Sequence, residues 1–105
     1  MLKQPNVINE ASFHDVTITT TPKNLINLCL KYDIPFYSCN DGEDKTNFDF
    51  EFETHDGCKF LVYDWKEYRS LDLNEQIEFH IGAKDRSDSN YACDILQDEL
   101  SILNN

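Results

Sequence analysis

Residues 48–53 alternate strictly between phenylalanine and a carboxylate. The six residues, in chain order, are Phe48, Asp49, Phe50, Glu51, Phe52 and Glu53. Successive side chains of a β-strand point to opposite faces, so this period of two predicts a strand with one apolar and one acidic face. A sheet that buries the phenylalanines must therefore carry the carboxylates on its other side.

The segment that follows this strand predicts a hairpin. His55, Asp56 and Gly57 form a turn signal, because the Asp-Gly pair suits the tight turns that join antiparallel strands. The return strand, Cys58 to Trp65, is apolar at both odd and even positions, which is typical of a strand covered on both sides. We therefore expect it in the middle of the sheet.

The first half of the chain predicts one more strand and a helix. The run from Phe13 to Thr20 is rich in β-branched residues and predicts a strand. Thr21 and Pro22 predict the N-cap and first position of a helix that ends before Pro35. Its apolar positions follow the spacing i, i+3, i+4, i+7 and are Leu25, Leu28, Cys29 and Tyr32.

A last strand is predicted at 77–81, where apolar residues alternate with Glu78 and His80. A final helix is predicted from about Ser89 to Leu103, with Ser87 or Ser89 as its N-cap. The order β-α-β-β-β-α predicts an α+β fold, a mostly antiparallel sheet with two helices packed on one face. Residues 1–12 are expected to form a loosely ordered arm and residues 13–105 a single domain.

Composition limits the partners. Twenty Asp and Glu against nine Lys and Arg give a net charge of −11, which repels nucleic acid and anionic lipid and attracts a basic protein surface. The chain shows neither a secretory leader nor a run of about 20 apolar residues, so we expect a cytoplasmic protein that does not bind membranes. Four widely spaced cysteines are then expected to be free thiols.

The acidic tract is the first candidate binding site. Its carboxylates are Asp41, Glu43, Asp44, Asp49, Glu51 and Glu53. Those on one strand face lie about 6.6 Å apart and could imitate a nucleic-acid strand before a groove lined by Lys and Arg. With Glu78 and His80 they would give a face almost uniformly of one sign, at a cost in repulsion. The alternative is an ordinary solvated face of an antiparallel sheet.

Two further segments are candidates. Trp65 and Tyr68 are of the residue types most frequent at binding hot spots, although aromatic residues there could also cap the core edge. The loop before the last helix carries the only clustered positive charge and hydroxyls, the makings of a phosphate site, in Lys84, Arg86, Ser87 and Ser89. The alternative is a helix start in which Asp85 and Asp88 neutralise both cations.

The sequence offers little catalytic chemistry. His14, His55 and His80 are isolated, and no Cys or His pair has the spacing of a zinc site. We therefore expect a protein that is not an enzyme and that uses neither a metal nor another cofactor. The apolar residues of the arm leave a homodimer open.

Four segments between residues 40 and 82 carry a resemblance: Asn40–Thr46, Phe50–Thr54, Val62–Tyr68 and Ile77–Gly82. This part of the chain resembles small acidic proteins of bacteriophages and mobile elements. The resemblance implies a protein that binds and disables a host factor, such as a nuclease of a defence system.

The leading hypothesis is thus a non-enzymatic inhibitor whose acidic sheet face blocks a host nuclease or nucleic-acid-binding protein. The alternative is a small-ligand binder that sequesters a phosphorylated or cyclic-nucleotide signal through the loop before the last helix.

Overall fold

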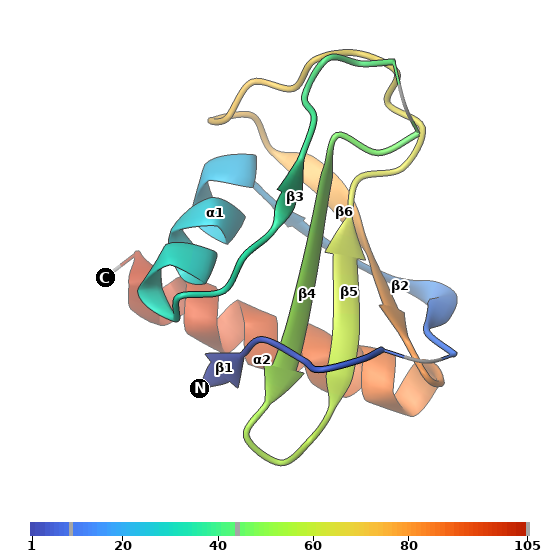
Figure 1. Cartoon of the computed structure of the whole chain (residues 1–105), viewed down its shortest axis with the longest axis vertical. Helices are drawn as coiled ribbons and strands as arrows, with labels where there is room; N and C mark the ends of the chain where they lie inside the picture. Colours follow the sequence, from blue (N-terminus) through green and yellow to red (C-terminus); the bar gives the residue numbers. More distant parts are fainter. Residues whose placement is uncertain (9, 44, 105) are drawn as a thin grey trace.

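The computed structural model describes residues 1–8, 10–43 and 45–104 (Figure 1). The elements in chain order are β1 (Leu2–Lys3), β2 (Ser12–Thr20), α1 (Pro22–Lys31), β3 (Tyr37–Ser38), β4 (Phe48–Thr54), β5 (Lys59–Tyr63), β6 (Ile77–Ala83) and α2 (Arg86–Leu103). One antiparallel sheet has the order β1-β4-β5-β6-β2, and β3 pairs with β4 as well. Both helices pack on one side of it, which confirms the predicted α+β class.

The core lies between the sheet and the helices. Phe48, Phe50 and Phe52 are fully buried or nearly so, and Phe79 crosses Phe50 edge to face at 6.3 Å. The predicted alternation of β4 is therefore confirmed, with every second side chain in the core. Large aromatic side chains supply most of the hydrophobic stabilisation in a domain of this size.

The start of α1 follows the local sequence. Thr21 is the N-cap, and its hydroxyl oxygen accepts a hydrogen bond from the Asn24 amide at 3.1 Å. Pro22 occupies the first turn, where its missing N–H costs nothing. Leu25 and Leu28 are completely buried, as the predicted helical spacing requires.

The hairpin between β4 and β5 is also confirmed. Gly57 has φ +93°, in the left-handed region that glycine enters without strain. Phe52 then pairs with Phe60 across the two strands. The strand β5 lies between β4 and β6, as predicted, but it ends at Tyr63 instead of Trp65.

The last helix begins earlier than predicted, and its predicted N-cap is wrong. Asp85 is the N-cap, and its carboxylate accepts a hydrogen bond from the Asp88 amide at 2.8 Å. Ser89 is buried one turn later, where its hydroxyl donates to the Asp85 carbonyl at 2.9 Å. Asp is as good an N-cap as Ser, so Asp85 can cap the helix two residues before the first of the two predicted serines.

The segment expected as an arm runs across the sheet. Leu2 is buried, and β1 pairs with the end of β4 at Thr54 and Glu53. The chain then crosses in front of β4 and β5 on the side away from α2 (Figure 1). There Lys59 donates from Nζ to the Val7 carbonyl at 2.8 Å.

The opposite edge of the sheet is formed by β2. Its pairing with β6 shifts in register between Phe13 and Thr17, which marks a β-bulge. Asp15, inside this interval, has φ +62°. The bulge separates the start of the strand from its regular part, Thr17 to Thr20.

We predict that Phe50→Ala lowers the free energy of unfolding by about 3–5 kcal/mol, because it removes a fully buried ring and leaves a cavity. Phe13→Ala is the matched control, since the Phe13 ring is 38% exposed, and should cost less than about 1 kcal/mol. Urea unfolding followed by fluorescence measures both. Equal losses would contradict the assignment of the core to this side of the sheet.

Candidate functional site

The side of the sheet away from the helices is called the outer face here. Its side chains come from alternate positions of four strands and are Phe13, Thr17, Thr19, Asp49, Glu51, Glu53, Lys59, Leu61, Tyr63, Glu78 and His80. Neither helix packs on this face in the part of the chain that the structure describes. The arm covers only its hairpin end, around Lys59.

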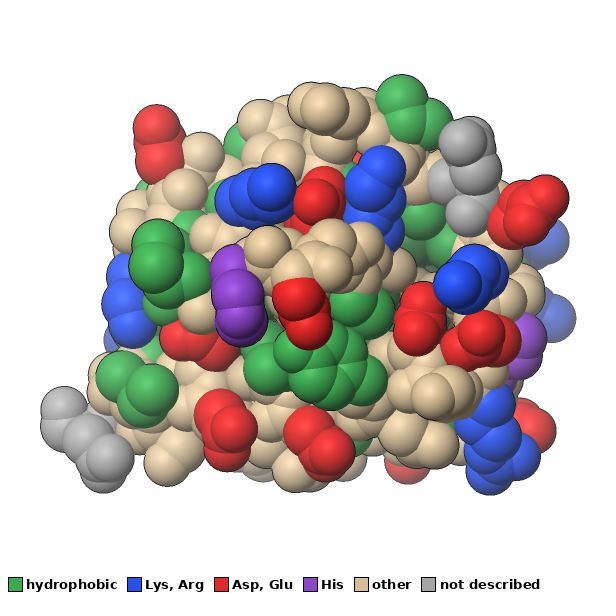
Figure 2. Space-filling view, turned by 90° about the horizontal axis from the view of Figure 1, so that it is seen from below, with side chains coloured by type: hydrophobic (Ala, Val, Ile, Leu, Met, Phe, Trp, Pro, Cys, Tyr) green, Lys and Arg blue, Asp and Glu red, His purple; other side chains and the backbone are tan. Residues whose placement is uncertain are grey.

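The three β4 carboxylates share this face, but their surroundings differ. Glu51 is exposed, whereas Asp49 is partly buried. Glu53 forms an ion pair with Lys3 at 3.4 Å and lies opposite Lys59 on β5. The expectation of a face almost uniformly of one sign was therefore wrong, because a strand from the N-terminal segment brings a lysine to β4. Figure 2 shows the molecule from the hairpin end, where Asp and Glu side chains lie among Lys or Arg and His side chains.

An aromatic cluster occupies the other part of the outer face. Phe13 stacks on His80 at 4.0 Å between ring centroids, with an interplanar angle of 11°. Tyr63 lies 5.6 Å from His80 and 6.0 Å from Trp65. Sequence reasoning singled out Trp65 but missed Phe13 and His80 as its neighbours. Pairing of β2 and β5 with β6 brings them together, and no local pattern carries that information.

Trp65 is 40% exposed and contacts two cations. The Nζ atoms of Lys45 and Lys66 lie 5.7 and 5.5 Å from the centroid of its rings. Such cation–π contacts hold an exposed ring in place by about 0.5–1 kcal/mol each. The tryptophan thus keeps an exposed aromatic surface while its orientation is restrained.

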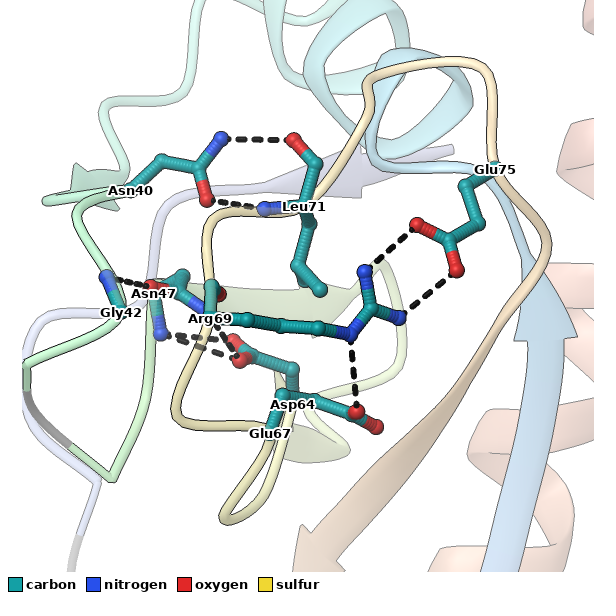
Figure 3. A network of polar contacts seen from close by, with 8 residues as sticks. All are labelled: Asn40, Gly42, Asn47, Asp64, Glu67, Arg69, Leu71 and Glu75. Carbon is teal, nitrogen blue, oxygen red and sulfur yellow. Dashed lines mark hydrogen bonds and ion pairs between the residues drawn. The ribbon is translucent and has the colours of Figure 1, made fainter.

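The loops beside the cluster are tied together by a buried carboxylate (Figure 3). Asp64 is completely buried and accepts hydrogen bonds from the amides of Asn47, at 2.9 Å, and Phe48, at 2.8 Å. The Asn47 side chain donates both to Asp64 at 3.1 Å and to the Arg69 carbonyl at 2.9 Å. Residues 39–43, 45–47 and 64–75 are named the loop network, because these bonds join the two loops.

Two more contacts complete the loop network. Asn40 acts like a strand partner of Leu71, donating to its carbonyl at 2.7 Å and accepting from its amide at 2.6 Å. Gly42, with φ +79°, lies so close to Arg69 that an added Cβ would be 2.6 Å from the Arg69 Cα. Only glycine fits there, so the Asn40-Asp41-Gly42 run packs closely against Arg69.

The segment that carries Trp65 and Tyr68 has a strained backbone. Lys66 and Tyr68 have φ +57° and +51°, which costs non-glycine residues of order 1 kcal/mol each. Arg69 beyond them makes two hydrogen bonds to Glu75, at 3.0 and 2.7 Å, and this contact lowers the pKa of Glu75 below its usual range. Tyr68 is held 54% exposed by this frame.

The predicted loop carboxylates lie in the same network. Asp41 and Glu43 are both exposed, and Asp41 accepts a hydrogen bond from the Glu43 amide at 3.0 Å. That bond, together with one from the Cys39 thiol at 3.4 Å, lowers the pKa of Asp41. Asp44, the remaining predicted carboxylate, lies outside the described residues.

The predicted phosphate site is filled by the protein's own groups. The Asp85 carboxylate caps the helix amides, and Lys84 pairs with Asp88 at 3.9 Å. Ser89 is buried and bonded to the backbone, while Arg86 and Ser87 are exposed. A bound phosphate would meet the negative charge of Asp85 at the position where it needs free amides.

Three of the four thiols are not activated. Burial raises the pKa of Cys29 to about 12 and that of Cys58 to about 11, and it raises the pKa of Cys93 as well. A protonated thiol is a weak nucleophile and a poor metal ligand. Within residues 1–8, 10–43 and 45–104 no group of three or more His, Cys, Asp or Glu side chains could hold a metal. The helices found there are too short or too polar to cross a membrane.

Asp49 is a partly buried carboxylate whose surroundings disfavour its charged form. Burial, with the nearby negative charges of Glu51 and Asp64, raises its pKa to about 6. Its Oδ1 atom is buried and accepts no hydrogen bond from any described residue. The side chain of Tyr63, opposite Asp49 on β5, has a raised pKa partly because of this charge.

Asp64→Asn should destabilise the protein by about 2–4 kcal/mol, because one acceptor oxygen becomes a donor that faces N–H groups. Amide hydrogen exchange should accelerate in the loop network before it does in β5 and β6. Asp98→Asn, on the exposed side of α2, is the matched control and should change the free energy of unfolding by less than about 0.5 kcal/mol.

Asp49→Asn should stabilise the protein at pH 7.5 by about 1 kcal/mol, allowing for the partial exposure of this side chain. The folded protein keeps the Asp49 proton up to about pH 6, whereas the unfolded chain loses it near pH 4. The difference between variant and wild type should therefore vanish as the pH falls from 6 to 4. A lower melting temperature of the variant at pH 7.5 would contradict this account.

Comparisons with family models, with curated proteins and with solved structures find no match to this chain. The case for a function therefore rests on the geometry and charge of the outer face and the loop network.

Proposed function

We propose that this protein binds a basic surface of a nucleic-acid-binding or nucleic-acid-cleaving protein and inhibits it by occupying its nucleic-acid groove, without catalysing a reaction. One observation carries the proposal: the β4 carboxylates, of which Glu51 is exposed, and an aromatic cluster that includes the exposed Phe13 and Trp65 share an outer face that no helix covers among the described residues. The proposal places the protein in the cytoplasm, where such partners are found.

Charge supports the choice of partner. A net charge of −11 accelerates association with a cationic surface and disfavours contact with nucleic acid itself. The carboxylates of Asp49 and Glu51 lie on one face of β4, and the exposed carboxylates of Asp41 and Glu43 belong to the loop before that strand. Carboxylates of this kind suit a groove whose lysines and arginines normally contact successive phosphates.

The aromatic residues support tight binding. Charged contacts at the rim of an interface mainly change the association rate, while buried aromatic anchors hold the complex together. Trp65 and Tyr68 are both exposed, and two lysines restrain the orientation of the Trp65 ring. Restraining a side chain before binding lowers the entropy lost on association. The backbone strain at Lys66 and Tyr68 is the kind of local cost that persists at binding sites.

The alternative of a phosphorylated small ligand gains no support from the loop before α2. Asp85 caps the helix amides, and Asp88 pairs with Lys84. A ligand phosphate would have to displace a carboxylate that is bonded to the backbone. The outer face therefore remains the better candidate.

The first test is affinity capture from a cell lysate with elution by a salt gradient and identification by mass spectrometry. We expect a partner with a basic nucleic-acid groove, released by moderate salt, from which the protein and nucleic acid displace each other. Stoichiometric binding that leaves nucleic-acid binding by the partner unchanged would refute the proposal.

Variants of the outer face should separate the two contributions. Glu51→Lys should slow association about tenfold and weaken its salt dependence, while Tyr68→Ala should speed dissociation about tenfold. Asp98→Lys makes the same charge change on α2 and should alter the association rate less than threefold. Surface plasmon resonance at several salt concentrations measures these rates. If Glu51→Lys and Asp98→Lys changed the association rate equally, only the net charge of the protein would matter. That result would contradict a specific binding site on the outer face.

A further inference from the structure

The edge of β4 is only partly covered. Its first residues pair with β3 and its last residues with β1. Residues 50–52, between these two short strands, have no strand neighbour on that edge within the described chain. A pocket of about 350 Å³ opens beside this gap, lined by Pro35, Phe36, Tyr37, Asp49 and Glu51. It is named the β4 pocket.

The walls of the β4 pocket are aromatic and acidic. Phe36 packs on Phe50 in the core at 5.4 Å, so that wall is fixed to the sheet. Tyr37 lies directly opposite Asp49 in the pairing of β3 with β4. The lining contains two carboxylates, those of Asp49 and Glu51. Among the described residues, no lysine or arginine belongs to it.

Asp49 is a carboxylate whose charge is not compensated by its surroundings. Its Oδ1 atom is buried and accepts no hydrogen bond from the described residues. The charged groups that act on it are Glu51 on the same strand and Asp64 beyond β5, both negative, and they add to burial in raising its pKa. The residues opposite it on β5 and β3 are Tyr63 and Tyr37, and neither is a cationic residue type. A cation from a binding partner would supply the positive charge and the hydrogen-bond donor that Asp49 lacks among the described residues.

We propose that the β4 pocket receives the guanidinium group of an arginine side chain presented by the basic partner. This proposal rests on the proposed function and specifies the chemistry of the partner at one point of the outer face. A guanidinium offers five N–H donors in a plane, which suits two carboxylates and the main-chain carbonyls at an unpaired strand edge. A flat guanidinium also suits a pocket with aromatic residues in its lining better than a lysine ammonium does.

A six-residue arginine peptide is the probe that tests this site. With carboxyl-labelled protein, NMR should show the pKa of Asp49 falling from about 6 to below about 5 when the peptide saturates. Amide shifts should change most at residues 35–37 and 49–51. Asp49→Asn should weaken peptide binding about tenfold, whereas Asp98→Asn, with the same loss of charge, should weaken it less than twofold.

A lysine peptide of equal length should bind about fivefold more weakly than the arginine peptide. Equal affinity for both would overturn the guanidinium assignment. An unchanged Asp49 titration in the presence of bound peptide, or equal losses for Asp49→Asn and Asp98→Asn, would overturn the site. Because Asp49→Asn is expected to be the more stable protein, misfolding would not explain its loss of binding.

The outcomes separate this inference from the function on which it rests. If the arginine peptide leaves the pKa of Asp49 unchanged while the captured partner still competes with nucleic acid, the β4 pocket is not an arginine site and the inhibitor proposal stands. If arginine moves the titration but no partner with a nucleic-acid groove binds, the pocket stands and the inhibitor proposal fails.

Discussion

The buried carboxylate of Asp64 holds together the end of the molecule on which the proposed binding surface depends. It receives main-chain N–H groups from the start of β4 and the amide of Asn47, whose other bonds reach Arg69 and Gly42. Water is excluded there, so each of these bonds is worth more than its equivalent at the surface. Trp65 follows Asp64 directly in the chain. The position of the exposed Trp65 therefore depends on the hydrogen bonds of the buried Asp64 carboxylate.

Much of the fold could be predicted because its determinants are local. The alternation in β4, the Thr21 cap with Pro22, and the Asp56–Gly57 turn each specify an element within a few residues. Two amphipathic helices and a sheet with one apolar side then leave few ways to bury the core. The placement of both helices on one face follows from that constraint rather than from any single motif.

The parts of the site that were not predicted depend on contacts between distant segments. Lys3 meets Glu53 only because two residues at the start of the chain join the edge of β4. Phe13 and His80 meet only because β2 returns to the far edge beside β6. A buried Asp and Asn look like ordinary loop residues in the sequence, and only the folded structure pairs Asp64 with Asn47. The residue pattern of a single strand predicts which side chains share a face, whereas the order of the strands in the sheet determines which residues are neighbours across strands.

The bulge in β2 has a consequence for how copies of the chain meet in solution. This nine-residue strand is the longest one at a border of the sheet, and a straight border of that length invites hydrogen bonding to another molecule. The shift in register and the left-handed backbone at Asp15 divide the edge of β2 into two parts. A straight strand of another molecule cannot form hydrogen bonds with both parts at once. The backbone shape of β2 thus disfavours continuous sheets between molecules at high protein concentration. The repulsion between molecules that each carry a net charge of −11 acts in the same direction.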